Sequence, residues 1–434
     1  MLKVLFGRKE QNCEGTSRRS FLQVGALGFG HLTLSNLLAR RASAADSQRE
    51  AKETSVVWLW LNGGPTHIET FDPKMTAPVE FRSVTGEVKT ALPGVTLGGN
   101  FGGIAKLADK MAFVRSFAVP SSSHNRAAFW VNTGHNHTAN RPSLGSITAR
   151  VRGPNHAVSG MPTYVQMGRI GFNTDAPRIP GPAWLGKAYA PFSPGGQARE
   201  NMNLTTPVSR LDDRRSLLQD LDQLRRETDA SGIIEGIDGF NQQALNLILG
   251  EAPHAFDLDK EDPNVVASYG DGLGASLLTA RRLCEAGCGF VAVSLQGWDM
   301  HGNVRGGMNR RGPQVDRAVS AFVEDIYQRG LDEKILLVVS GEFGRTPRIN
   351  KNAGRDHWGQ LSTLMLSGGG LRVGRTVGES SDKAEYPKSG LVTPQDLMAT
   401  VFQVLGIAPD TYFHDPSGRP TPMLEDGKPI AGLL

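Results

Sequence analysis

Three short polar segments in the last third of the 434-residue chain combine carboxylates, imidazoles and arginines. The segments contain Asp299 and His301, then Glu342 and Arg345, then Arg355, Asp356 and His357. Imidazole nitrogens and carboxylate oxygens are common protein ligands of divalent metal ions, and guanidinium groups bind oxyanions. Each segment alone is also typical of an ordinary polar turn. Together they predict a divalent-metal site with an anion-binding group beside it.

Asp299, His301 and His357 are the first candidates for metal ligands. One carboxylate, two imidazoles and a water form the usual open shell of a catalytic zinc-type ion. Glu342 offers a ligand for a second metal or a general base, and an ion pair with Arg345 inside its own loop is nearly as good an explanation. We expect the three ligands to converge although they are far apart in sequence.

Arg355 and Asp356 are candidates for supporting roles beside this site. Arg355 is expected to bind an anionic substrate through two parallel hydrogen bonds. Asp356 is predicted to be a ligand, or a partner that holds His357 in one tautomer. Arg345 or Arg355 would stabilise the negative charge that develops during ester cleavage.

Asn62 and Ser122 are candidates from the first third of the chain. Asn62 ends an apolar run and precedes two glycines, so a ligand can approach the backbone closely, and its amide oxygen is a weak metal ligand. Ser122 lies just before a predicted helix, where a metal-activated hydroxyl would be well placed as a nucleophile. A helix-capping serine explains it equally well, and His124 adds an imidazole nearby.

The elements that must position these residues follow an alternating pattern. Apolar runs predict strands at 56–61, 111–115, 289–295, 334–340 and 361–366, and helical periodicity predicts helices at 102–108, 141–150, 273–286, 313–328 and 394–405. Such alternation is typical of a mostly parallel, doubly wound sheet with helices on both faces. Ligands bind at the carboxyl ends of the strands in these sheets, and Asn62, Asp299 and Glu342 all fall there.

The first 44 residues are predicted to be a twin-arginine signal peptide. Arg18 and Arg19 precede a short, glycine-rich apolar stretch, and 42–44 is a small-residue cleavage site. The expected partner is therefore the Tat translocase, and the expected location is the periplasm or another exported compartment. The apolar stretch is too short and polar to serve as a stable membrane anchor. No other stretch is long and apolar enough to cross a bilayer, so no membrane span is expected in the mature chain.

The overall net charge of +4 is carried by this signal. Residues 1–44 have seven Lys or Arg and two Asp or Glu, so the rest of the chain is near neutral. A basic balance confined to the signal excludes the usual argument for nucleic-acid binding. Residues 45–434 are predicted to form a single domain, with a loop and helical insertion at 171–255 that includes charged helices at 209–227 and 234–249.

The motifs taken together resemble a known family. They lie at 17–22, 61–65, 71–74, 141–146, 280–283, 297–301, 341–347 and 354–358. On these residues the chain is identified as a member of the Tat-exported bacterial family known as domain of unknown function 1501 (DUF1501). That family is similar to the alkaline phosphatase and sulfatase superfamily. The resemblance implies an alkaline-phosphatase-like three-layer α/β sandwich with divalent metals at the strand ends.

The resemblance also implies roles for particular residues. Asp299, His301 and His357 would correspond to the ligands of the superfamily's first metal. Glu342 stands where the superfamily has an aspartate followed by a histidine, and Asn62 stands where it has an aspartate. Because Phe343 and Asn62 cannot replace those ligands, one tight site for zinc, calcium, magnesium or manganese is expected, with a weak or missing second site.

The function implied is that of an exported metal-dependent hydrolase of phosphate, sulfate or related anionic esters. In it the metal polarises the ester, and Ser122 or a metal-bound water attacks. No cysteine lies in the segment directly before Arg126, so the formylglycine route of sulfatases has no starting residue there. The alternative is a non-catalytic descendant that binds an anionic glycan or a partner protein.

Overall fold

The computed structural model describes residues 53–171, 181–194 and 252–434. The predicted signal peptide at 1–44 lies outside these residues, and so do the helices predicted at 209–227 and 234–249. Among the described residues, no helix combines the length and the apolar character that a bilayer span requires.

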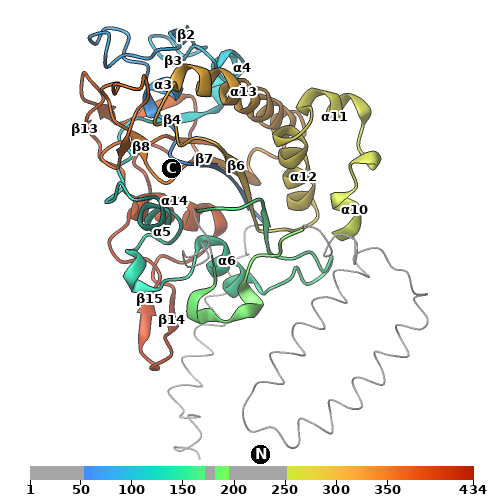
Figure 1. The fold of residues 1–434 in the computed structure, drawn as a ribbon. Coiled ribbons are helices and arrows are strands. Elements are labelled where there is room, and N and C mark those ends of the chain that lie inside the picture. Colours follow the sequence, from blue (N-terminus) through green and yellow to red (C-terminus); the bar gives the residue numbers. More distant parts are fainter. Residues whose placement is uncertain (1–52, 172–180, 195–251) are drawn as a thin grey trace, which may run out of the picture. The chain divides into compact units, whose positions relative to one another are not determined.

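A central sheet of seven strands organises the described residues, in the order β11-β4-β10-β7-β1-β6-β5 (Figure 1). The strands are β1 (Ser55–Asn62), β4 (Ala112–Val114), β5 (Tyr164–Met167), β6 (Phe290–Gln296), β7 (Ile335–Ser340), β10 (Leu364–Gly368) and β11 (Arg375–Val377). β1 runs parallel to β6 and β7, β5 is parallel to β6, and β11 is parallel to β4. β10 is antiparallel to both of its neighbours. The sheet is therefore mainly parallel, as predicted, with one reversed strand.

Helices cover both faces of this sheet, which confirms the three-layer α/β sandwich (Figure 1). One face packs against α4 (Gly102–Lys106), α10 (Ala252–Phe256), α11 (Pro263–Tyr269), α12 (Leu273–Glu285) and α13 (Val304–Gln328). The other packs against α5 (His124–Thr133), α6 (Leu144–Arg152) and α14 (Pro394–Leu405). Smaller elements are α3 (His67–Thr70), β2 (Glu87–Lys89) with β3 (Thr96–Gly98), β8 (Gly344–Arg345) with β9 (His357–Trp358), β12 (Glu379–Ser380) with β13 (Pro387–Ser389), and β14 (Tyr412–His414) with β15 (Pro420–Pro422).

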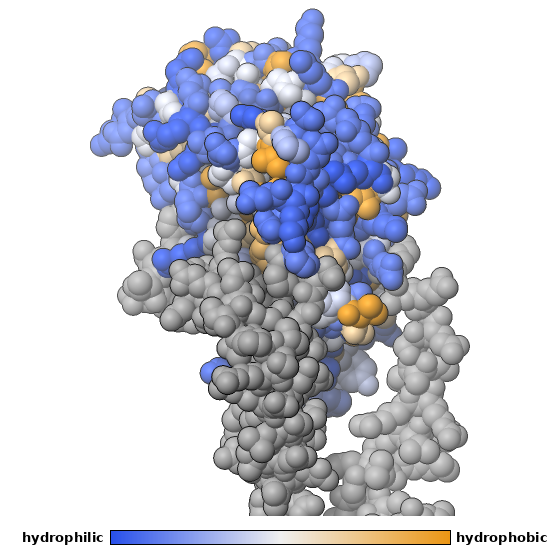
Figure 2. Space-filling model, turned by 90° about the vertical axis from the view of Figure 1, so that its right-hand side faces the viewer, coloured by the Kyte–Doolittle hydropathy of each residue, from blue (hydrophilic) through white to orange (hydrophobic). Residues whose placement is uncertain are grey.

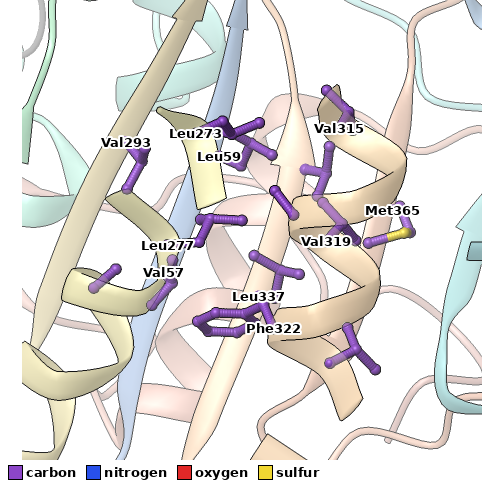
Figure 3. Packing of buried hydrophobic residues seen from close by; sticks show 14 of the residues in the cluster. Val57, Leu59, Leu273, Leu277, Val293, Val315, Val319, Phe322, Leu337 and Met365 are labelled. Atoms are coloured by element: carbon purple, nitrogen blue, oxygen red, sulfur yellow. The ribbon is translucent and has the colours of Figure 1, made fainter. Parts of the chain in front are cut away.

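Strand β1 shows why the apolar run at its centre has no polar break. Val57 and Leu59 point into the core on one side of the sheet, whereas Trp58 and Trp60 point into the core on the other side. Successive side chains of a strand alternate between its faces, so a strand covered on both sides must be apolar throughout. In Figure 3, Val57 and Leu59 pack with Leu277 of α12 and the facing side chains of α13. Each such side chain stabilises the fold by about 1.5–3 kcal/mol on full burial.

Helix α13 begins nine residues before the helix predicted at 313–328. The sequence prediction placed Pro313 in the first turn, where proline is favoured, but Pro313 lies inside the helix. The actual N-cap is Asn303, whose side chain accepts a hydrogen bond from the backbone N–H of Gly306. This early start matters because it places the beginning of α13 three residues after His301.

A charged network joins the segment before α11 to helices α12 and α13. Glu261 accepts hydrogen bonds from Arg281 (2.6 Å), Arg282 (2.9 Å) and Arg329 (3.2 Å). Asp325 contacts Arg281 (3.0 Å) and Arg329 (2.7 Å). Burial alone would raise the pKa of Glu261, but the hydrogen bonds from Arg282 and Arg281 outweigh this effect and lower the pKa to about 2.

Stability in acid is expected to depend on Glu261. A carboxyl whose folded-state pKa lies below its unfolded value contributes stability above the unfolded pKa and loses it as the pH falls. The free energy of unfolding should therefore decrease between about pH 4.5 and about pH 2 more steeply in the natural chain than in Glu261→Gln. At neutral pH the substitution should cost about 1–3 kcal/mol. Urea denaturation over this pH range measures both effects, and parallel pH profiles for the two proteins would contradict the assignment.

The surface turned toward the viewer in Figure 2 is mostly hydrophilic, and its hydrophobic residues are scattered. The large hydrophobic residues that the described part exposes, such as Val79, Val158 and Leu391, come from separate segments. Single exposed apolar residues are normal on a soluble surface.

Candidate metal centre

The candidate centre lies where several strands end and α5 begins. Asp299 follows β6, Glu342 follows β7, and His357 starts the short strand β9. His124 is the first residue of α5. The predicted placement at the carboxyl ends of strands therefore holds for Asp299 and Glu342, which follow parallel neighbours of β1.

The structure brings Asp299, His301 and His357 together, as the sequence analysis expected. Asp299 Oδ1 lies 3.0 Å from His301 Nε2 and 3.2 Å from His357 Nε2. The two Nε2 atoms are 2.9 Å apart. His124 lies at the other carboxylate oxygen, with its Nε2 3.5 Å from Asp299 Oδ2. His124, Asp299 and His357 each offer one ligand atom, and these three atoms all lie within 4.8 Å of one another.

The other nitrogen of each imidazole faces an oxygen acceptor. Nδ1 of His301 lies 2.8 Å from Asp356 Oδ1, Nδ1 of His357 lies 3.1 Å from the Ser122 carbonyl, and Nδ1 of His124 lies 2.7 Å from Glu342 Oε1. A carbonyl or carboxylate oxygen can only accept, so each Nδ1 donates its proton. A neutral imidazole that donates from Nδ1 has its lone pair at Nε2.

These tautomers provide a test of whether the site fits a metal ion. Nε2 of His301 and Nε2 of His357 lie beside Oδ1 of Asp299, and Nε2 of His124 lies 3.5 Å from Oδ2. Lone pairs gathered around one carboxylate repel each other unless a cation or an extra proton lies between them. Metal-bound histidines commonly donate their second nitrogen to a carboxylate or backbone carbonyl in this way. The donor set of His124, His301, His357 and Asp299 therefore fits a divalent ion.

Arg345 fixes the orientation of Asp299. Its fully buried guanidinium donates to Asp299 Oδ1 (2.5 Å), to the carbonyl oxygens of Gly64 (2.9 Å) and Arg355 (3.1 Å), and to that of Gly63. Each of its three nitrogens donates to a protein atom, so Arg345 acts on the site through Asp299. The sequence analysis had instead considered Arg345 as a group that contacts substrate.

The titration of the site reflects these contacts. Burial alone raises the pKa of Asp299, but hydrogen bonds from His124, His357 and Arg345 outweigh it, and the pKa lies far below its usual range. Burial lowers the pKa of His124, but the carboxylates of Asp299 and Glu342 outweigh it and raise the pKa. The carboxylate at the centre thus stays ionised and attracts cations.

Asp356 supports His301, whereas the sequence analysis paired it with His357. The contact between Asp356 Oδ1 and His301 Nδ1 lowers the pKa of this exposed carboxyl. The loop before Asp356 lies tightly against His301, because a Cβ on Gly354 would be 2.1 Å from the His301 carbonyl oxygen. Only glycine allows this approach, which brings the loop of His357 to the loop of His301.

Arg355 lies away from the centre, contrary to its predicted role as an anion clamp. Its guanidinium is fully buried and binds the equally buried carboxylate of Glu69, with Nε 2.9 Å from Oε2 and Nη2 2.9 Å from Oε1. It also donates to the carbonyl oxygens of Thr346 and Pro347. These bonds use the donors that a substrate would need.

Asn62 is also fully engaged. Its Oδ1 accepts from Trp60 Nε1 (3.0 Å) and from the Gly171 backbone (2.9 Å), and its Nδ2 donates to Gln296 Oε1 (2.6 Å). The amide oxygen therefore serves the protein, and Asn62 stands apart from the imidazoles. Gln296 links it to the neighbouring strand, because Asn62 and Gln296 are paired in the β1–β6 register.

Glu342 and Ser122 lie beside the centre. Glu342 is buried, and its Oε1 accepts from His124 Nδ1 and from the Gly63 backbone (2.9 Å). Its Oε2 has no hydrogen-bond partner among the described residues. Ser122 is exposed, and its Oγ accepts from the Gly359 backbone N–H (2.9 Å). Its carbonyl holds His357, so the segment before α5 positions both imidazoles that flank Asp299.

His124 is the site residue that the sequence analysis did not select. It was noted only as an imidazole near the serines, and the available signal was its place at the start of a helix after Ser121–Ser123. The partner that defines its role, Glu342, is 218 residues away.

A family model described as "Protein of unknown function (DUF1501)" matches residues 53–434. No curated protein matches the chain.

The chain is also similar to several solved structures, and the three described next each have a TM-score below 0.5. The lipoteichoic acid synthase LtaP from Listeria monocytogenes has a TM-score of 0.38 and 10% identity over 88% of this chain and 76% of that chain. The PsFucS1 sulfatase from Pseudoalteromonas sp. has a TM-score of 0.37 and 11% identity, over 87% of this chain and 72% of that chain. The phosphonate monoester hydrolase SpPMH from Silicibacter pomeroyi has a TM-score of 0.34 and 12% identity, over 87% of this chain and 76% of that chain.

Proposed function

The chain belongs to the DUF1501 family, and we propose that it is an exported, metal-dependent hydrolase of phosphate, sulfate or related esters. The observation that carries the proposal is the convergence of three imidazole Nε2 atoms on Asp299, with each Nδ1 held by an oxygen acceptor. A cation among these atoms would relieve their mutual repulsion, and four nitrogen and oxygen ligands suit a divalent metal.

The ligands favour a zinc-type ion over calcium or magnesium. Calcium and magnesium prefer oxygen ligands, whereas imidazole suits zinc and similar transition metals. His124, His301, His357 and Asp299 would hold the ion. When bound, the ion supplies Lewis acidity that polarises an ester oxygen.

The remaining groups of the site have separate tasks. Arg345 holds Asp299, Glu342 orients His124, and Asp356 orients His301. The attacking group is the exposed hydroxyl of Ser122 or a water molecule. Ser122 precedes a ten-residue helix, and the positive end of that helix stabilises negative charge on a bound ester.

The test combines metal analysis with a substrate panel. Protein purified without chelator is expected to contain about one equivalent of divalent metal, because one set of ligands is assembled. It should hydrolyse at least one of a panel of aryl phosphate, sulfate and phosphonate esters, and lose that activity with the metal. Two tightly held equivalents, or no metal at all, would contradict the assignment of the site.

A non-catalytic binding protein is the second candidate. It is favoured by the internal bonding of Arg345, Arg355 and Asn62, which leaves none of them to contact a reacting ester. In that case the metal centre would bind an anionic glycan or a partner protein. Tight metal retention without hydrolysis of any ester in the panel would favour this candidate over the enzyme.

Export through the Tat translocase is part of the proposal. Residues 1–44 lie outside the described residues, so the support is the Arg18-Arg19 pattern and the small residues at 42–44. Replacing both arginines with lysine is expected to leave the precursor in the cytoplasm at nearly its full length. Fractionation with immunoblotting measures this, and N-terminal sequencing of the exported natural protein should begin near Ala45. Undiminished export of the variant would contradict the signal assignment.

A further inference from the structure

Helix α13 carries an arginine at a core-facing position. Val304, Met308 and Val315 lie on the buried stripe of the helix, and each is at most 1% exposed. Arg311 occupies the position between Met308 and Val315 on the same stripe, at the helical spacing of three and four residues. Its side chain is half-buried, and its Nε is buried with no hydrogen-bond partner. A charged group in this place requires an explanation.

The guanidinium of Arg311 lies over the end of β6. A Cβ built on Gly297, the first residue after β6, would be 2.7 Å from Arg311 Nη2 and 2.8 Å from Nε. Gly297 also has a φ of +96°, so glycine is needed there for two reasons. Since Gly297 and Asp299 are two residues apart, their Cα atoms are at most about 7.6 Å from each other. Arg311 therefore lies beside the short segment that leads from β6 to Asp299.

Arg311 has no carboxylate partner among the described residues. Its one hydrogen bond there runs from Nη1 to Gln314 Oε1, at 3.3 Å, on the same helix. At the other end of α13, Arg329 pairs with Asp325 and with Glu261. A partly buried cation without a counter-ion costs free energy, and a bound anion would remove that cost.

We propose that Arg311 binds a second anionic group of the substrate. The substrate would then be an ester that carries a further carboxylate, sulfate or phosphate close to the group that is cleaved. A guanidinium presents a planar pair of donors that matches each of these oxyanions. This inference rests on the proposed function, because it places the reacting ester at Asp299 and its second anion at Arg311.

The test uses anions of two lengths on the metal-loaded protein. Isothermal titration calorimetry with orthophosphate reports binding at the centre, and tripolyphosphate adds a second charged group. In Arg311→Met the affinity for tripolyphosphate should fall by about tenfold or more, whereas that for orthophosphate should change by less than about threefold. Arg311→Lys should retain part of the difference. The thermal midpoint of Arg311→Met should equal or exceed that of the natural chain, since methionine suits the buried stripe.

Arg310→Met is the matched control. Arg310 is the exposed neighbour on the same helix, it has no ion pair within the described part of the chain, and its loss changes the net charge equally. Equal effects of the two substitutions on tripolyphosphate binding, or unchanged tripolyphosphate binding in Arg311→Met, would overturn the inference. The proposed function would still stand if the natural chain contained the metal. A natural chain that binds no metal would overturn the proposed function itself.

Discussion

Replacing His124 with alanine is expected to remove the metal as effectively as replacing His357. Both imidazoles place Nε2 beside the carboxylate of Asp299, and both have Nδ1 held by an oxygen. Loss of a hydrogen-bond partner of a metal ligand typically costs about 10–100-fold in affinity, so loss of the ligand should exceed about 100-fold. That factor corresponds to about 2.7 kcal/mol. Competition with a chelator of known affinity measures it.

Two control variants separate this expectation from general damage. His414→Ala removes an exposed imidazole on β14 and should leave the metal affinity unchanged. Asn62→Ala should lower stability, because it breaks the bonds to Trp60 and Gln296, but folded protein should keep its metal. If His124→Ala kept its metal and Asn62→Ala lost it, the ligand set inferred from the family resemblance would be better than the set seen in the structure.

The fold was largely predictable because its signals are local. The run at 56–61 is apolar at every position, which only a strand covered on both faces requires, and the structure confirms both cores. Strand order in a parallel sheet then places the loops after β6 and β7 beside β1. The sequence predicted the shared edge without this order, because Asp299 and Glu342 each follow an apolar run and the carboxyl ends of parallel strands lie at one edge of a sheet.

The partners of the site residues could not be predicted in this way. Arg355 and Arg345 occur in equally polar loops, and only the fold shows that one is paired with Glu69 and the other with Asp299. The direction of β10 was equally hidden, because a short apolar run does not reveal whether it is parallel or antiparallel. His124 was not chosen as a candidate site residue, because its partner Glu342 is distant in sequence.

Arg355→Met is expected to destabilise the protein by about 3–5 kcal/mol. Arg355 and Glu69 are both fully buried, and the substitution would leave the Glu69 carboxylate inside the protein without its counter-ion. Glu69 would keep its hydrogen bonds from Thr66 Oγ1 (2.6 Å) and the Val84 backbone (3.2 Å), but these are too few to replace a bidentate guanidinium. Arg355→Lys should lose part of the same stability, since an ammonium cannot reach both oxygens as the planar group does. Urea denaturation measures all three proteins.

A double variant tests whether the pair itself is responsible. Glu69→Gln combined with Arg355→Met removes the unpaired charge, so the double variant should be more stable than Arg355→Met alone, and the coupling energy should be about 1–3 kcal/mol. Arg348→Met is the control, because Arg348 is exposed and has no ion pair within the described residues. It should change stability by less than about 0.5 kcal/mol.

The same measurement distinguishes the two roles considered for Arg355. A buried structural cation and a substrate clamp predict opposite results for Arg355→Met. If Arg355 acted on substrate, the variant would keep its unfolding free energy and lose affinity for anions. If it holds the loop that precedes His357, the variant should lose stability first, and metal affinity should fall only in conditions where part of the protein is unfolded. Because the guanidinium also bonds to the backbone of Thr346 and Pro347, on the loop that carries Arg345, the second result is the one expected.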